Sequence, residues 1–307
     1  MTEKENSYHQ PVLLKESVDG LITDRNGIYI DATFGGGGHS REVLSRLDVD
    51  GRLIGFDQDK DAVENTISDE RFELIQNNFR YLKNSLRFMK IKRIDGVLAD
   101  LGVSSHQFDI DSRGFSIRGN ARLDMRMQQS AELDAFKVVN EYSETELRRV
   151  FKDYGELRNA GRVASKVLYC RSQEKIESTH QLVEALKSMA PKQKQNQFLA
   201  QVFQAIRIEV NDELNALKDF LNQCTDIIKS DGKLVVISYH SLEDRLVKRF
   251  MKTGNFSGEM KKDFYGNPIR PFIPAKGGVI TPNNKELEVN NRARSAKLRI
   301  AQRNAEE

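Results

Sequence analysis

The stretch YIDATFGGGGHS, residues 29–40, places four consecutive glycines directly after an apolar run and directly before a helix-like segment. Glycine gives up more backbone freedom on folding than any other residue, so four in a row need a structural reason. A glycine turn between a strand and a helix lets the backbone approach a ligand closely, and the first free N–H groups of the helix favour a carboxylate or phosphate. The stretch therefore predicts a ligand-binding turn in an α/β fold.

The residues around this turn have the pattern of a parallel sheet. Short apolar runs typical of strands buried on both faces occur at residues 28–33, 52–57, 72–76 and 94–100. Helix-like segments separate them at 39–47, 59–68 and 80–90. Strands that alternate with helices at this spacing predict a doubly wound, Rossmann-like sheet with right-handed crossovers.

The pattern changes after the fourth strand. Apolar residues fall at helical spacing in 144–155, 161–170 and 179–190. A long helical segment from Gln195 onward carries on one face Phe203, Ile206, Val210, Leu214, Leu217 and Leu221. Strands resume at 232–239 and at 295–303, the second after a loop rich in Gly, Pro and Asn between 254 and 291. We therefore expect a discontinuous sheet domain, 1–107 and 209–307, with a helical domain inserted at 108–208.

Composition sets broad limits. The 307 residues carry a formal net charge of +3, no apolar run long enough to span a membrane, and no apolar signal core in the first ten residues. These features predict a cytoplasmic protein. Cys170 and Cys224 have neither disulfide-framework nor zinc-site spacing and are expected to be buried free thiols, so no metal is predicted.

Two features together favour a nucleoside cofactor. The turn reads G-x-G-x-x-S through Gly35, Gly37 and Ser40, and Asp57 ends the second strand, where a carboxylate can accept hydrogen bonds from both ribose hydroxyls. Nicotinamide dinucleotides and S-adenosylmethionine share this geometry. The fourth strand ends in ADLGVSSHQ, residues 99–107, and this crowding of small polar residues favours a shaped pocket for a methyl acceptor.

Several motifs together resemble one family. They are HQPVLLKE, DATFGGGGHS, DLGVSSHQFD, RGFSI, LDMRM, YGE, FQAIRIEVNDEL, SYHSLEDRLVKRF and NNRARSAKLR, which run from His9 to about Arg303. The chain thereby resembles the bacterial small-subunit rRNA methyltransferases RsmH, also called MraW. The resemblance implies methyl transfer from S-adenosyl-L-methionine to the exocyclic N4 amine of a cytidine in the decoding region of 16S rRNA. It also implies a methyltransferase sheet with a helical domain inserted after strand four.

The resemblance also assigns a cofactor pocket. It implies that the methionine end lies at Gly37, Gly38 and His39, the ribose at Asp57 and the adenine at Phe79, with Asp100 and Gln107 completing the pocket.

The acceptor restricts the catalytic groups. The lone pair of the cytosine N4 amine is delocalised into the ring, so an oxygen that accepts its N–H bond would hold it near the tetrahedral geometry that attack requires, and the proton can leave after transfer. Asp100 is the first choice for this acceptor. His240 is the second, and it could take the released proton or contact RNA.

Basic residues beside the expected site predict RNA binding. Arg113, Arg118, Arg122 and Arg126 lie in a glycine- and aromatic-containing loop, and the C-terminal motif adds Arg292, Arg294, Lys297 and Arg299. The target base must be unpaired or flipped out to expose its amine.

Other possibilities stay open from the sequence. A nicotinamide-dependent oxidoreductase is disfavoured by Ser40 and by the strand-four loop, and a catalytically silent RNA-binding module by the competent residue at every cofactor position. The substrate can be free rRNA or the assembled small ribosomal subunit, with DNA cytosine as a second target, and the protein can be a monomer or a homodimer.

Overall fold

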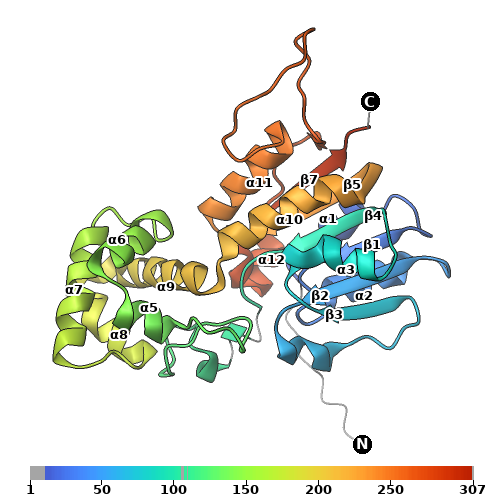
Figure 1. Ribbon diagram of the computed structural model, residues 1–307. Helices are drawn as coiled ribbons and strands as arrows, with labels where there is room; N and C mark the ends of the chain where they lie inside the picture. Colours follow the sequence, from blue (N-terminus) through green and yellow to red (C-terminus); the bar gives the residue numbers. More distant parts are fainter. Residues whose placement is uncertain (1–10, 105–106, 109, 306–307) are drawn as a thin grey trace, which may run out of the picture. The chain divides into compact units, whose positions relative to one another are not determined.

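The computed structural model describes residues 11–104, 107–108 and 110–305, and the chain divides into two compact units. The sheet unit comprises Met1–Gly102 with Leu214–Glu307, and the helical unit comprises Val103–Glu213 (Figure 1). The sequence placed the boundaries after residues 107 and 208, whereas the contacts divide the chain after Gly102 and Glu213.

The sheet unit is built on seven strands in the order β3-β2-β1-β4-β5-β7-β6. The strands are β1 (Ile28–Asp31), β2 (Arg52–Asp57), β3 (Phe72–Gln76), β4 (Ile94–Asp100), β5 (Ile228–Ser238), β6 (Phe272–Pro274) and β7 (Lys297–Arg303). β1 to β5 pair in parallel, β7 is antiparallel to β5, and β6 is antiparallel to β7. The predicted α/β, Rossmann-like class is confirmed. The strand order reverses between β1 and β4, which is where such sheets bind ligands.

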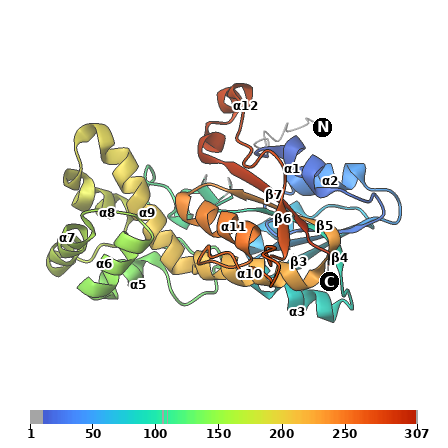
Figure 2. The same ribbon diagram turned by 90° about the horizontal axis from the view of Figure 1, so that it is seen from above.

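Helices cover both faces of this sheet. α1 (Leu14–Leu21) and α2 (Gly38–Arg46) lie on one face, and α3 (Leu82–Phe88), α10 (Glu213–Ile227) and α11 (Ser241–Thr253) on the other (Figure 2). Strand residues alternate between the two cores, since Tyr29 and Leu98 pack in the cluster of α1 and α2, whereas Ile30 and Val97 pack in the cluster of α3 and α10. Burial on both faces explains why these strands read as continuous apolar runs.

The helical unit has its own core. It contains α5 (Ala135–Glu141), α6 (Glu144–Asp153), α7 (Ala160–Gln173), α8 (Thr179–Leu186) and α9 (Gln195–Asn211). Capping boxes begin α6 at Ser143 with Glu146 and α8 at Ser178 with Gln181, which fixes where both helices start. None of the described helices combines the length and apolar composition that crossing a lipid bilayer requires.

The predicted long helix from Gln195 is wrong in one respect, because the structure divides it into α9 and α10. Asp212 adopts φ 48°, ψ 38°, and this left-handed residue ends α9. As a result Phe203 and Ile206 pack in the core of the helical unit, whereas Leu217 and Leu221 pack against the sheet.

Two other segments also differ from expectation. The helix predicted over 59–68 is the 3-10 helix η1 (Lys60–Asn65), which begins where the Asp59 carboxylate accepts a hydrogen bond from Asp61 N. The predicted loop at 254–291 contains β6 and the short helix α12 (Asn284–Val289). β6 has only three residues and contains Pro274, so its strand pattern is weak in the sequence.

Candidate active site

The glycine turn joins β1 to α2 as predicted. Gly37 adopts φ 74° at the N-cap of α2, and a Cβ there would lie 2.9 Å from the Phe34 ring. A Cβ on Gly38 would collide with the ring of Pro11. These two positions therefore require glycine for backbone conformation and for close packing.

Asp57, at the end of β2, holds the glycine turn. Its Oδ2 accepts a hydrogen bond from Gly35 N at 2.8 Å, and its Oδ1 accepts one from Asp59 N at 2.8 Å. Burial raises the pKa of this carboxyl to about 6, against the lowering effect of the two backbone bonds. The side chain that the sequence assigned to the ribose therefore also fixes the turn assigned to the methionine end.

Asp31, the last residue of β1, links the glycine turn and the start of α2 to the sheet. Its Oδ2 accepts a hydrogen bond from Ser40 Oγ at 2.7 Å, and its Oδ1 accepts one from Thr33 N at 3.1 Å. Burial raises the pKa of Asp31 to about 6 despite these bonds. Ser40 stands where a dinucleotide fingerprint has its third glycine, and here its hydroxyl has a structural partner.

Asp100, at the end of β4, lies between two side chains from different elements. Tyr239, which follows β5, donates its hydroxyl hydrogen to Oδ1 at 2.8 Å, and His39 Nδ1, on α2, lies 3.9 Å from Oδ2. Thr33 Oγ1 accepts a hydrogen bond from Asp100 N at 2.6 Å, which fixes the strand end beside the glycine turn. Burial raises the pKa of Asp100 to about 6, while His39 and the Tyr239 hydrogen bond oppose this rise.

His39 is buried, and its Nε2 lies 3.1 Å from the carbonyl oxygen of Val12. A carbonyl only accepts, so Nε2 carries the hydrogen. Burial lowers the pKa of His39, whereas Asp100 and the bond to Val12 raise it. Nδ1 is therefore the ring nitrogen that faces Asp100.

Three carboxylates thus end three adjacent strands, since β2, β1 and β4 are neighbours in the sheet. Asp31 raises the pKa of both Asp57 and Asp100 through its charge, in addition to the larger effect of burial. The strand ends form an acidic edge next to a glycine turn, and such an edge suits a ligand that has ribose hydroxyls and positive charge.

His240 is the N-cap residue of α11. Its Nδ1 accepts a hydrogen bond from Glu243 N at 3.4 Å, and its Nε2 lies 3.2 Å from Glu243 Oε1. Glu243 Oε2 in turn accepts hydrogen bonds from the backbone N–H groups of Tyr239 and His240. This capping box fixes the backbone that carries the Tyr239 side chain.

The other assigned cofactor residues have local partners. Phe79 begins the 3-10 helix η2 (Phe79–Tyr81) after β3, is half-buried, and packs edge-on against Phe220 with ring centroids 5.2 Å apart. Gln107, in the helical unit, is buried, and its Oε1 accepts a hydrogen bond from Ser104 N at 3.1 Å. Ser105 and His106 lie outside the described residues.

The predicted RNA-binding arginines differ in exposure. Arg113 is buried and donates to the carbonyl oxygens of Arg126 and Met127, and Arg126 forms a paired contact with Asp124. Arg118 is exposed. Arg122 is also exposed, and its guanidinium donates to Asp134 at 2.8 Å.

In the C-terminal motif, Arg292 and Arg294 are exposed on the 3-10 helix η6 (Asn291–Ser295). Lys297 and Arg299 both bind Asp244 on α11. Arg118, Arg122, Arg292 and Arg294 therefore lie at the surface, whereas Arg113 stabilises its own loop.

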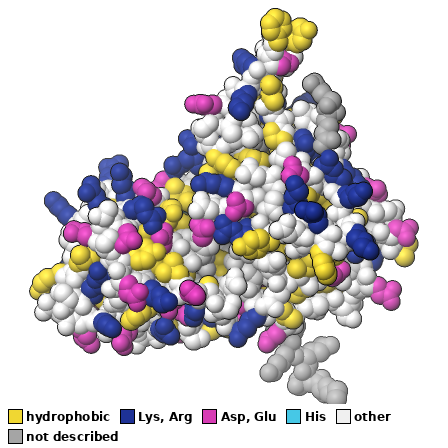
Figure 3. All heavy atoms as spheres, in the orientation of Figure 1, with side chains coloured by type: hydrophobic (Ala, Val, Ile, Leu, Met, Phe, Trp, Pro, Cys, Tyr) yellow, Lys and Arg dark blue, Asp and Glu magenta, His cyan; other side chains and the backbone are white. Residues whose placement is uncertain are grey.

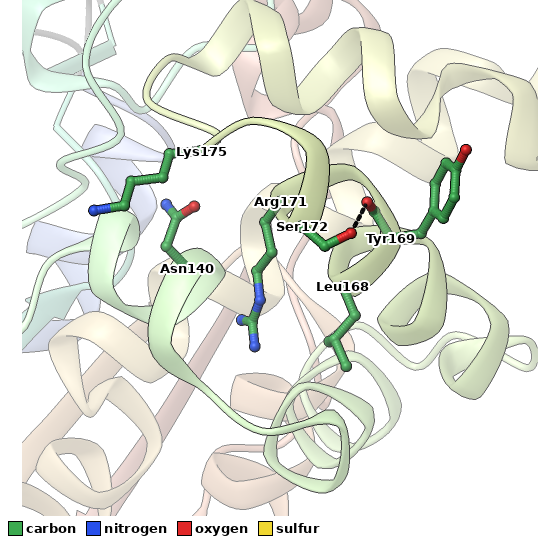
Figure 4. Close-up of a pocket in the computed structure, with 6 residues that line it drawn as sticks. All are labelled: Asn140, Leu168, Tyr169, Arg171, Ser172 and Lys175. Atoms are coloured by element: carbon green, nitrogen blue, oxygen red, sulfur yellow. Dashed lines mark hydrogen bonds between the residues drawn. The ribbon is translucent and has the colours of Figure 1, made fainter.

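A separate pocket lies within the helical unit (Figure 4). It is lined by Asn140, Leu168, Tyr169, Arg171, Ser172 and Lys175. Arg171 donates to the carbonyl oxygen of Val139 at 2.8 Å, and the Tyr169 ring points away from the other labelled side chains (Figure 4). The six described lining residues include no carboxylate or imidazole.

Sequence reasoning missed Tyr239, Thr33 and Asp31 as parts of the site. Asp31 and Thr33 belong to the DAT segment, residues 31–33, directly after an apolar run. Polar residues at the end of a predicted strand were therefore the signal that could have identified them. Tyr239 is 139 residues from Asp100 in sequence, and only the pairing of β4 with β5 brings the two together.

Comparisons with known proteins identify the family of the chain. Residues 6–304 match the model of a family described as the MraW methylase family. The protein named Ribosomal RNA small subunit methyltransferase H from Flavobacterium johnsoniae is 57% identical over 96% of this chain and 98% of its own length. Its namesake from Bacteroides fragilis is 51% identical over 99% and 100%.

A crystal structure of an rRNA methylase from Streptococcus thermophilus aligns over 95% of this chain and 93% of its own, with 12% identity and a TM-score of 0.42, a likeness too low to support an assignment. The assignment rests on the sequence matches, which do not support a nicotinamide-dependent oxidoreductase. The chain belongs to the MraW methylase family, whose methyl donor is S-adenosyl-L-methionine.

Proposed function

We propose that this methyltransferase transfers a methyl group from S-adenosyl-L-methionine to the exocyclic N4 amine of a cytidine in the decoding region of 16S rRNA. The names of the relatives support small-subunit rRNA as the substrate. The observation that carries the proposal is the Asp100 carboxylate, which ends β4 beside the glycine turn and is oriented by Tyr239. A ribosomal substrate would place the enzyme in the cytoplasm.

The acidic edge and the glycine turn fit the cofactor. Asp57 would accept the ribose hydroxyls, and Gly37, Gly38 and His39 would hold the methionine end. Phe79 would lie by the adenine, and Gln107 would complete the pocket. The bound cofactor supplies an electrophilic methyl group on a positively charged sulfur, and the carboxylates at the strand ends favour that charge.

Asp100 would act on the acceptor amine. Its ionised carboxylate would accept one N–H of the amine and hold the nitrogen lone pair toward the methyl group, out of conjugation with the ring. After transfer the nitrogen carries an extra proton, and the same carboxylate would accept it. Tyr239 would keep Asp100 ionised and fixed, because a hydrogen bond to the charged form favours that form.

His240 would contribute to catalysis chiefly by capping α11 and so positioning Tyr239. Its Nδ1 already accepts from Glu243 N, so Asp100 is the better proton acceptor. Residues 108–208, which are inserted in the sequence of the catalytic domain (1–107 and 209–307), would form the substrate-recognition domain. Arg118, Arg122, Arg292 and Arg294 would bind RNA phosphates.

One experiment tests the proposal directly. Purified protein is incubated with labelled S-adenosyl-L-methionine and, separately, with naked 16S rRNA and with small subunits from cells that lack the enzyme. Mass spectrometry then maps the label. Label on one N4 amine of a decoding-region cytidine is the expected result, and it also reveals which assembly state is the substrate. Label on another atom, or none while the cofactor binds, contradicts the proposal.

A further inference from the structure

An ordered hairpin in the sheet unit ends in two aromatic side chains that face solvent. The hairpin spans residues 255–271 between α11 and β6 and projects as a long loop (Figure 1). Phe264 and Tyr265 at its tip are 98% and 85% exposed. Hydrophobic side chains cap the end of this projection, and both basic and acidic side chains lie below them (Figure 3). A pair of rings that buries almost nothing adds little to the stability of the fold.

The hairpin is anchored at its base. The Phe256 ring stacks on the buried Phe250 of α11, with centroids 5.3 Å apart and planes at 20°. The Asn255 carboxamide oxygen accepts from Gly258 N at 2.9 Å, and its Nδ2 donates to Glu259 O at 2.8 Å. The base of the hairpin is therefore held by an aromatic contact with α11 and by the hydrogen bonds of the Asn255 side chain.

The tip is also ordered. Asp263 Oδ1 accepts hydrogen bonds from Tyr265 N at 2.9 Å and from Asn267 N at 2.7 Å, and Oδ2 accepts one from Asn267 Nδ2 at 2.9 Å. Gly266 adopts φ 87°, a conformation suited to glycine. The backbone pairs below the tip, with Ile269 N donating to Lys261 O at 2.9 Å. These bonds fix the backbone that carries both rings, so binding need not pay the conformational entropy of ordering the loop.

The geometry of the two rings suits nucleobases. Phe264 and Tyr265 lie edge to face, with centroids 5.6 Å apart and planes at 86°, so they present ring faces in different directions. Every base has a π-face, and stacking on an aromatic side chain tolerates any sequence. Lys261 and Lys262 precede the tip and are exposed, which places positive charge where the phosphates of a stacked strand would run.

We propose that this hairpin tip is an RNA-binding site in which Phe264 and Tyr265 stack on unpaired bases of the rRNA substrate and the two lysines bind the adjacent phosphates. The proposal rests on the proposed function, because it assumes an RNA substrate. Bases inside a duplex have their faces covered, so the tip selects single-stranded segments. The tip would thereby help the enzyme to choose rRNA in which the region around the target is still open.

The chain has no Trp, which gives a clean probe. The Phe264→Trp variant carries one indole, at the tip, and is titrated with a short unpaired RNA and with the same sequence as a duplex. Strong quenching by the unpaired RNA and little quenching by the duplex is the expected result. Equal or absent quenching with both, while the protein still binds RNA, overturns the proposal.

A double variant measures the contribution of the rings. Phe264→Ala with Tyr265→Ala should bind unpaired RNA at least about tenfold more weakly than the wild type, since each stacked base contributes on the order of 1–3 kcal/mol. The matched control, Phe264→Tyr with Tyr265→Phe, keeps both rings and should bind like the wild type. Cofactor affinity and the midpoint of thermal unfolding should not change in either variant.

The failures can be told apart. If the wild type methylates small subunits and the double variant binds unpaired RNA equally well, the hairpin proposal alone fails. If the double variant binds naked RNA normally but assembled subunits weakly, the tip contacts a feature that is present only in the assembled subunit, and the assignment to unpaired bases is overturned. A wild type that binds cofactor but neither binds nor methylates rRNA overturns the proposed function, and this proposal with it.

Discussion

The hydroxyl of Tyr239 donates a 2.8 Å hydrogen bond to Oδ1 of Asp100, which joins the residue after β5 to the end of β4. The backbone of Tyr239 is also fixed, because its N–H donates to the Glu243 carboxylate at 3.0 Å within the cap of α11. A carboxylate held by a neutral donor stays ionised at lower pH than burial alone would allow. His39 and Tyr239 therefore both oppose the rise that burial causes in the pKa of Asp100.

Tyr239→Phe removes this hydrogen bond and little else. Burial raises the pKa of Asp100 to about 6, and the Tyr239 bond opposes the rise, so the variant should raise that pKa further. The acidic limb of the pH–rate profile should move to higher pH by about one to two units, since a hydrogen bond to a charged group contributes on the order of 1.5–3 kcal/mol. Single-turnover rates between pH 5 and 9 measure the shift. A profile that keeps its wild-type midpoint would contradict this role.

Asp100→Asn should slow methyl transfer by about a hundredfold or more, because the amide cannot take up the proton. Cofactor binding should change less than the rate. In the wild type, activity should rise with pH through about 6 as Asp100 ionises, and this limb should disappear in the variant. Single-turnover transfer together with calorimetric titration of S-adenosyl-L-methionine separates the two effects. An unchanged rate constant would remove Asp100 from the chemistry.

Asp57→Ala should weaken cofactor binding by about tenfold or more, because the carboxylate would bind the ribose and also holds Gly35 N. The pKa of Asp57 is raised to about 6, chiefly by burial, so wild-type affinity should fall as pH decreases through 6. Calorimetric titration at pH 5, 6 and 7.5 measures both effects. Glu73→Ala removes an exposed carboxylate from the neighbouring strand β3 and serves as the control. Equal affinities in the two variants would exclude the ribose assignment.

Much of the fold follows from the sequence because strands buried on both faces leave continuous apolar runs that end in polar residues. Asp57 and Asp100 were placed at strand ends in this way, and they end β2 and β4 in the structure. Contacts that depend on sheet pairing leave no local signal, which is why Tyr239 was missed. The sequence also gave no sign that the helix breaks at Asp212, because a left-handed aspartate does not interrupt the spacing of the apolar residues. The apolar residues before and after this break pack in two different cores.

Burial of charged side chains is equally invisible in the sequence. Arg113 and Arg118 lie in one basic loop, and the sequence predicts the same RNA-binding role for both. In the structure Arg113 is 8% exposed, its guanidinium donates to the carbonyls of Arg126 and Met127, and its Cζ lies 5.9 Å from the centre of the Phe115 ring. Their expected roles are therefore different.

Arg113→Ala should destabilise the helical unit by about 1–3 kcal/mol, because two carbonyl oxygens lose their donor. Arg118→Ala should leave the unfolding midpoint unchanged and weaken RNA binding, with a smaller dependence of affinity on salt, because an exposed phosphate contact is lost. Thermal unfolding and RNA titrations at several salt concentrations measure both quantities for both variants. If Arg113→Ala unfolds like the wild type but loses RNA affinity, the buried arginine reaches the RNA, and the structural role assigned to it here is wrong.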